Sequence, residues 1–179
     1  MSLLLATLLT GLVLIALGLP LLLNSAGYAA ILKAFPRSAA AANVVFPVAA
    51  VWFLYNIANL GAADLIIPKP YMFAAFALIA VLSMIYMREF LAVRGLAALV
   101  LVAAMPLLDS AYMKYELTQR LLMVTAVYAA IAVAIWLGAQ PWRLRDWIAW
   151  VCAQPGRSRG VGGALTGYGL VLAVVAFTY

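Results

Sequence analysis

Residues able to do catalytic or metal chemistry are scarce in this sequence. It contains no histidine, one cysteine (Cys152) and five acidic residues. The acidic residues are Asp64, Glu89, Asp109, Glu116 and Asp146. Imidazole is the commonest metal ligand and the usual haem ligand, and Ser–His or Cys–His catalysis also depends on it. We therefore expect no cofactor, no metal centre and no nucleophilic catalytic site.

The charged group Arg88, Glu89 and Arg94 is a candidate anion site. Arginine binds phosphate through paired hydrogen bonds, so this group suits a lipid phosphate. A membrane enzyme acting on lipid phosphate is one hypothesis, but such enzymes need carboxylates for metal or base chemistry, and this chain has few. We favour the alternative, in which these charges set the membrane topology and Glu89 pairs with a neighbouring arginine.

Asn56 and Asn59 lie one helical turn apart in an apolar stretch after Pro47. Amides within a membrane need hydrogen-bond partners, so they either lock two helices together or mark a substrate or ion pathway. Ion-coupled carriers usually place a carboxylate at mid-membrane, and none is expected here. We favour packing, and keep a small transporter or channel using both asparagines as an alternative function.

The densest basic cluster is interleaved with tryptophan. It comprises Arg143, Arg145, Arg157 and Arg159, with Trp142, Trp147 and Trp150. Tryptophan prefers the headgroup level of a membrane, and arginine attracts anionic headgroups. These residues are therefore expected to face lipid or a partner protein. We expect no nucleic-acid partner, because a chain with almost no loops offers no groove-reading element.

Gly163 and Gly167 form a GxxxG step near the C-terminus. Small residues at this spacing allow two membrane helices to approach closely. We expect them to pack against another helix of this chain or of a partner.

Composition places all of these residues in a membrane protein. Of the 179 residues, 69% are hydrophobic and only 9% are charged. Soluble domains are roughly 45–50% apolar and about 25% charged. A chain this apolar cannot bury its side chains in one water-solvated core.

Stretches without side-chain charge predict the membrane spans. Five are near or above the ~18–20 residues needed to cross the hydrocarbon layer: Met1–Ser25, Ser38–Ala63, Pro70–Met87, Leu121–Trp142 and Gly160–Tyr179. The first lacks a basic leader and is expected to remain as a transmembrane helix rather than a signal peptide.

A sixth stretch, Gly95–Leu108, is too short alone and must extend back through Phe90–Val93 or forward to Tyr112. No glycine or proline lies between Tyr71 and Arg94, so an alternative in which the third helix runs on to Arg94 and turns at Gly95 is left open, and the turn is placed only within a few residues.

The distribution of basic residues supports six spans. With six, one side holds eight basic residues and the other holds three. The first set is Lys33, Arg37, Arg88, Arg94, Arg143, Arg145, Arg157 and Arg159, and the second is Lys69, Lys114 and Arg120. Without the sixth span the two sides hold nearly equal numbers. The positive-inside rule therefore favours six spans, with the richer side cytoplasmic and both termini opposite.

Two amphipathic segments are expected to lie along the cytoplasmic membrane surface. Tyr28, Ile31, Leu32 and Phe35 form one apolar stripe at helical spacing, and Leu144, Trp147, Ile148 and Val151 form another within 141–152. Both segments are too short to span.

The sequence thus predicts one all-α polytopic membrane domain over residues 1–179, with six transmembrane helices and one or two short interfacial helices. The expected function is non-catalytic, as an accessory or structural subunit. Its expected partners are anionic lipids and other membrane subunits or copies of itself. We expect a bacterial inner membrane, since eukaryotic sorting signals are absent.

Overall fold

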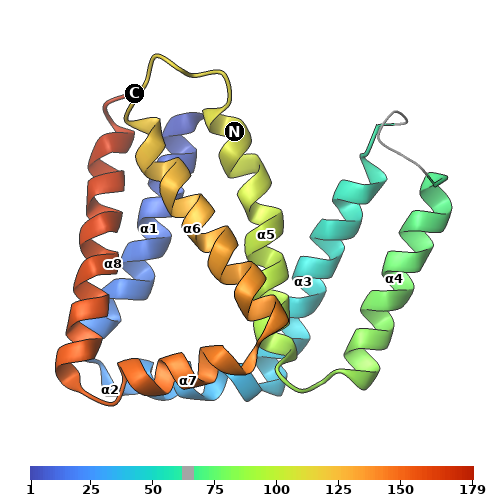
Figure 1. Ribbon diagram of the computed structural model, residues 1–179, viewed down its shortest axis with the longest axis horizontal. Coiled ribbons are helices and arrows are strands. Elements are labelled where there is room, and N and C mark those ends of the chain that lie inside the picture. Colours follow the sequence, from blue (N-terminus) through green and yellow to red (C-terminus); the bar gives the residue numbers. More distant parts are fainter. Residues whose placement is uncertain (62–66) are drawn as a thin grey trace.

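The structure is a computed structural model that describes residues 1–61 and 67–179, and these residues form helices and no strand (Figure 1). The long helices are α1 (Leu3–Leu22), α3 (Ala39–Ala58), α4 (Lys69–Tyr86), α5 (Leu91–Ala111), α6 (Arg120–Ala139) and α8 (Pro155–Ala176). The short ones are α2 (Ala26–Ala34), the 3₁₀ turn η1 (Phe35–Arg37) and α7 (Trp142–Val151).

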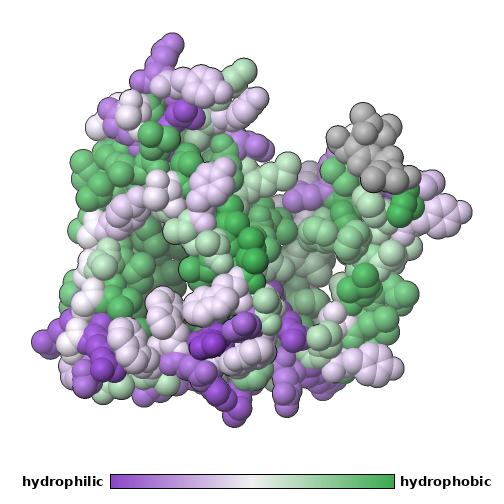
Figure 2. All heavy atoms as spheres, in the orientation of Figure 1, coloured by the Kyte–Doolittle hydropathy of each residue, from purple (hydrophilic) through white to green (hydrophobic). Residues whose placement is uncertain are grey.

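All six long helices are long and apolar enough to cross a membrane. They have 18 to 22 residues, which at ~1.5 Å per residue matches a hydrocarbon layer of ~30 Å. Figure 2 shows an apolar band across the middle of the molecule, with hydrophilic residues gathered towards its two ends. The prediction of an all-α membrane protein with six spans and additional short helices is confirmed.

The structure decides between the two arrangements that the sequence allows for the turn between the third and fourth spans. α4 ends at Tyr86 and α5 begins at Leu91, so the chain turns over residues 87–90 and not at Gly95, and the fourth span extends back as one alternative predicted. Phe90, the N-cap residue of α5, adopts a left-handed backbone with φ 55°, which is rare for residues other than glycine. Gly95 instead lies within α5, where an added Cβ would be 2.7 Å from the Cα of Phe46. Its small size allows α5 to cross α3 closely.

Four helices, α1, α5, α6 and α8, form the larger part of the molecule, which we call the body (Figure 1). Its core consists of side chains with almost no exposed surface, from all four helices. They are Leu3, Ala6, Ala104, Ala111, Met123, Val127 and Leu172. Tyr168 on α8 also donates a hydrogen bond of 2.8 Å to the carbonyl of Leu122 on α6. The body is therefore closed by packing and by polar links between helices.

The closest helix contact joins α1 and α8. Glycines line it on both sides: Gly11 and Gly18 on α1, and Gly162 and Gly169 on α8. An added Cβ at Gly18 would lie 2.8 Å from the carbonyl oxygen of Gly162. At each of these glycines, the backbone of the facing helix occupies the space that a larger side chain would need.

The GxxxG step of Gly163 and Gly167 does not lie in the contact between α1 and α8. An added Cβ at Gly167 would meet nothing within 4 Å, and one at Gly163 would meet only the tip of Leu22, at 3.7 Å. Within this chain, the α1 contact is therefore formed by Gly162 and Gly169 rather than by Gly163 and Gly167, whose packing against a partner stays a prediction. Neighbouring residues on a helix differ by ~100° in direction. The face of α8 that packs on α1 is therefore formed by Gly162, Thr166 and Gly169, and the side of the helix with Gly163 and Gly167 is turned away from it.

The remaining long helices, α3 and α4, extend away from the body, and we call them the arm (Figure 1). α3 packs against α5, whereas among the described residues the only helix with which α4 shares substantial contacts is α3. No residue of α4 is buried. The Phe53 and Phe76 rings meet edge to face, with centroids 5.1 Å apart. These bulky side chains hold the two arm helices apart.

Candidate functional site

One end of the molecule carries the two short helices and is strongly basic. α2 and α7 run across this end, while both termini lie at the opposite end (Figure 1). The basic residues here come from α2, η1, the turn before α5, α5 itself, α7 and the start of α8. They are the eight that charge distribution assigned to one side: Lys33, Arg37, Arg88, Arg94, Arg143, Arg145, Arg157 and Arg159. We call this end the basic end.

α7 is amphipathic in the way the sequence predicts. Leu144, Ile148 and Val151 are buried against the molecule. Trp142, Trp147 and Trp150 are about half exposed, at 45%, 50% and 50%. Trp147, predicted as part of the apolar stripe, thus lies at its edge. An outward-facing row of indoles on a buried aliphatic face suits the headgroup level of a membrane.

The arginines around α7 are partly engaged within the chain. Arg145 forms a 2.8 Å ion pair with Asp146, and Arg143 donates to the side chain of Gln140 at 3.1 Å. The Arg157 guanidinium lies 4.8 Å from the centre of the Trp150 ring. These contacts fix the side chains along the surface and leave further N–H donors directed outwards.

α2 lies beside α7, and together they cover the basic ends of α5 and α6. Leu32 and Phe35 pack with the buried residues Val93, Leu137, Leu144 and Ile148. Cys152 is a free, half-buried thiol beside the same cluster. Tyr28 donates to the carbonyl of Leu17 at 3.4 Å, and partial burial raises the pKa of its hydroxyl.

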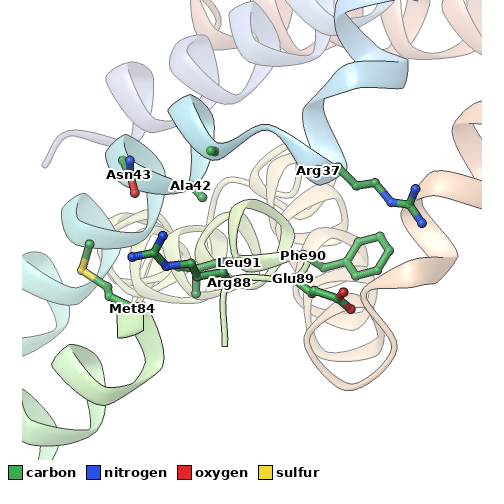
Figure 3. Close-up of a pocket in the computed structure, with 9 residues that line it drawn as sticks. Arg37, Ala42, Asn43, Met84, Arg88, Glu89, Phe90 and Leu91 are labelled. Atoms are coloured by element: carbon green, nitrogen blue, oxygen red, sulfur yellow. The ribbon is translucent and has the colours of Figure 1, made fainter. Parts of the chain in front are cut away.

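A cavity of about 550 Å³ opens at the basic end, where the arm meets the body, and we call it the corner cavity. Its wall comes from η1 and the start of α3, from the end of α4, and from the turn that leads into α5. The side chains that matter for chemistry are Arg37, Asn43, Met84, Arg88, Glu89 and Phe90 (Figure 3). The fold thus joins Arg88 and Glu89 to residues from far earlier in the chain.

Side chains divide the corner cavity into two parts (Figure 3). The Arg88 guanidinium extends towards Asn43 and Met84. Arg37 lies over Phe90, with its guanidinium carbon 5.7 Å from the ring centre. The left-handed backbone at Phe90 helps to place this ring, at a cost of about 1 kcal/mol that the surrounding contacts must offset.

The predicted local pairing of Glu89 is not found. Across residues 1–61 and 67–179 the one ion pair within 4.0 Å joins Arg145 to Asp146. Glu89 points towards the Phe90 side of the corner cavity while Arg88 extends away from it (Figure 3). Arg94 is on the first turn of α5 and lines an adjoining hollow with Arg88, Glu89 and Trp142. The three predicted residues are therefore close in space but not ion-paired.

Asn56 and Asn59 lie near the end of α3 that is remote from the basic end. The Asn59 amide donates to the carbonyl of Tyr55, in its own helix, at 2.7 Å. Asn59 is the C-cap residue of α3 and is exposed, so its hydrogen bond is local rather than interhelical. Asn56 is half buried on the same last turn. Neither residue lines the corner cavity.

The sequence alone did not reveal that Arg37, Asn43 and Phe90 line the same cavity as Arg88. Arg37 was assigned only to topology, and nothing in its neighbourhood points to the turn after α4. One available signal was the coincidence of Arg37 and Arg88 on the same predicted membrane side, each next to the end of a span. Asp64, an expected non-cytoplasmic acid, lies outside the described residues.

Comparison with models of known protein families, with curated proteins and with solved structures gives no significant match. Within the described ranges, no group of three or more Cys, Asp or Glu side chains is placed to hold a metal ion.

Proposed function

We propose that this protein is a non-catalytic accessory or structural subunit of a membrane assembly, and that its arm contacts the partner. The observation that carries this proposal is how little of α4 is packed against the rest of the chain. This helix has no buried residue and packs mainly on α3, across a contact that leaves a cavity of about 170 Å³. Membrane helices associate through close packing and hydrogen bonds, so α4 has little within this chain to fix its position.

The outer face of α4 is apolar along its whole length. Tyr71, Leu78, Val81 and Ile85 are 71%, 59%, 55% and 55% exposed. They recur at helical spacing on the side opposite Phe76, Ala80 and Ser83, which face α3. A partner helix against this face would supply the packing that the chain itself lacks.

Co-purification in mild detergent from native membranes tests this proposal. Leu78→Trp enlarges the outer face of α4 and is expected to reduce the amount of bound partner about tenfold. Leu9→Trp is the matched control, because Leu9 is similarly exposed, at 52%, on α1. A fixed-stoichiometry partner, either a different subunit or a second copy, should survive Leu9→Trp and be lost with Leu78→Trp. A chain that purifies alone, or equal loss in both variants, would contradict the proposal.

The geometry gives less support to transport or catalysis. The Asn59 amide is satisfied within its own helix, which weakens the case for a pathway through Asn56 and Asn59. The corner cavity has Glu89 as the one acidic side chain in its described wall, whereas catalysis on a phosphate ester ordinarily uses carboxylates both to hold a metal ion and to act as the base. Binding is the better-supported role for that cavity.

We further propose that the basic end is cytoplasmic, as in a bacterial inner membrane, with both termini on the opposite side. The asymmetry of basic residues supports this orientation. In a Cys152→Ser background, Gly156→Cys should react with a membrane-impermeant maleimide only after the cytoplasmic face is opened. Tyr115→Cys, 69% exposed near the other end, should react in intact cells. The reverse pattern would overturn the orientation.

A further inference from the structure

The corner cavity combines positive charge with apolar walls at one membrane surface. Arg37 and Arg88 enter it from separate segments of the chain, and Asn43 adds an amide donor. Neither guanidinium lies within 4.0 Å of a carboxylate in the described parts of the chain. Their N–H donors therefore form no ion pair with the described residues. Guanidinium N–H groups match the oxygens of a phosphate in geometry and charge.

The start of α3 adds to this positive field. Ala39 and Ala42, on the first turn of α3, line the corner cavity. The Ser38 side chain accepts a hydrogen bond from the backbone N–H of Ala41 at 3.1 Å, so the N–H groups of residues 39 and 40 have no partner within the helix. The N-terminus of a 20-residue helix carries a partial positive charge that favours an anion.

Glu89 opposes this field with one negative charge, and the apolar walls indicate what kind of anion fits. Met84, Phe90 and Leu91 line the same cavity. A volume of about 550 Å³ lies within the usual range of ~300–1,000 Å³ for ligand pockets. A small inorganic anion would use the arginines but leave the apolar walls without a contact.

We propose that the corner cavity binds the phosphate group of an anionic phospholipid, with Arg88 and Asn43 contacting the phosphate, Arg37 adding positive charge from the Phe90 side, and the apolar wall contacting the glycerol and upper acyl chains. This site is independent of the partner contact proposed for α4, because it lies on the inner side of the arm at the basic end. Its chemistry is that of a phosphodiester, which a soluble phosphate ester shares, so the acyl chains distinguish the two sources.

Native mass spectrometry of the delipidated full-length protein tests this site. Dioleoylphosphatidylglycerol should bind with one preferred site, more tightly than dioleoylphosphatidylcholine, and glycerophosphoglycerol, its deacylated phosphodiester, should not compete at similar concentrations. Arg88→Gln should weaken phosphatidylglycerol binding about tenfold, since a charge-assisted hydrogen bond is lost. Arg37→Gln should weaken it about threefold, since it removes a nearby positive charge without a direct contact. Glu89→Gln should strengthen it by about threefold, because a repulsive charge is removed.

Lys33→Gln is the matched control, because Lys33 is an exposed cation at the basic end outside the corner cavity. It removes the same charge and should change binding by no more than about twofold. All four side chains are exposed, and helical circular dichroism should show unchanged folding. Equal weakening by Lys33→Gln and Arg88→Gln would reduce the effect to general surface charge and overturn the site. Equally tight binding of glycerophosphoglycerol would overturn its assignment to a lipid.

Discussion

The α1–α8 pair and the α3–α4 arm are both antiparallel pairs of apolar helices, yet they are built in opposite ways. Gly11, Gly18, Gly162 and Gly169 let α1 and α8 touch through their backbones. Between α3 and α4, Phe53 and Phe76 meet ring to ring, and a cavity remains beside them. Since lipid solvates apolar side chains as well as a protein does, close backbone approach rather than hydrophobicity holds membrane helices together. The α1–α8 pair is therefore closely packed along its length, whereas the α3–α4 pair is loosely packed.

Hydrogen bonds reinforce the same difference. Ser158 on α8 donates to the carbonyl of Leu21 on α1 at 3.1 Å, and Tyr168 joins α8 to α6. In the arm, Lys69 at the start of α4 donates to the carbonyl of Ala58 at 3.0 Å, at the exposed end of α3. Polar links in the body are thus buried or half buried, whereas this link in the arm is open to competition from water.

The largest expected effect comes from filling the glycine contact. Gly162→Leu should lower the free energy of unfolding by about 3 kcal/mol or more, because the new side chain must displace the backbone of α1. Gly167→Leu, on the open side of the same helix, should cost less than about 0.5 kcal/mol. Denaturant unfolding in detergent micelles measures both. Equal costs would mean that α1 and α8 do not pack on this face.

A second, smaller contrast compares equivalent leucines in the two regions. Leu172→Ala should lower the free energy of unfolding by roughly 2 kcal/mol, because Leu172 is 0% exposed in the body core and its truncation leaves a cavity. Leu78→Ala in the arm should stay within about 0.5 kcal/mol, since lipid fills the space in the isolated chain. The same unfolding series provides the readout. A large cost at Leu78 would show that α4 is packed within this chain.

The smallest effect is expected from a single buried hydrogen bond. Tyr168→Phe removes the link to Leu122 and should cost about 0.6 kcal/mol, the average for hydrogen bonds between membrane helices. Tyr128→Phe is the control, because Tyr128 is 59% exposed on α6 and should show no change. A cost that exceeds that of Leu172→Ala would mean that polar links rather than packing hold the body together.

The spans could be predicted from the sequence, because charge in hydrocarbon is costly and its absence is visible residue by residue. The amphipathic α7 was equally visible, since the burial of Leu144, Ile148 and Val151 follows from helical spacing alone. The residues through which two helices contact each other could not be predicted from the sequence. Gly162 and Gly163 are identical in type, and only the position of α1 decides which one is in contact.

The turn and the corner cavity escaped prediction for related reasons. The chain turns between α4 and α5 over residues that include no glycine or proline, with a left-handed Phe90 just before α5. Gly95 suggested a turn, yet its small size serves the crossing with Phe46. Arg37 and Arg88 line one cavity only because η1 and α3 pack beside the start of α5 at the basic end. Pairing between distant segments leaves no local pattern in either one.

Site-specific photocrosslinking in native membranes tests the central claim, that the arm is completed by a partner. A photoreactive phenylalanine analogue in place of Leu78 on α4 should give a discrete protein adduct, and the same analogue in place of Leu9 on α1 should give none, although both positions are about equally exposed. A second copy of this chain or a different membrane protein in the adduct would each complete the arm. Adducts to lipid alone at Leu78, or the same products at both positions, would contradict the account.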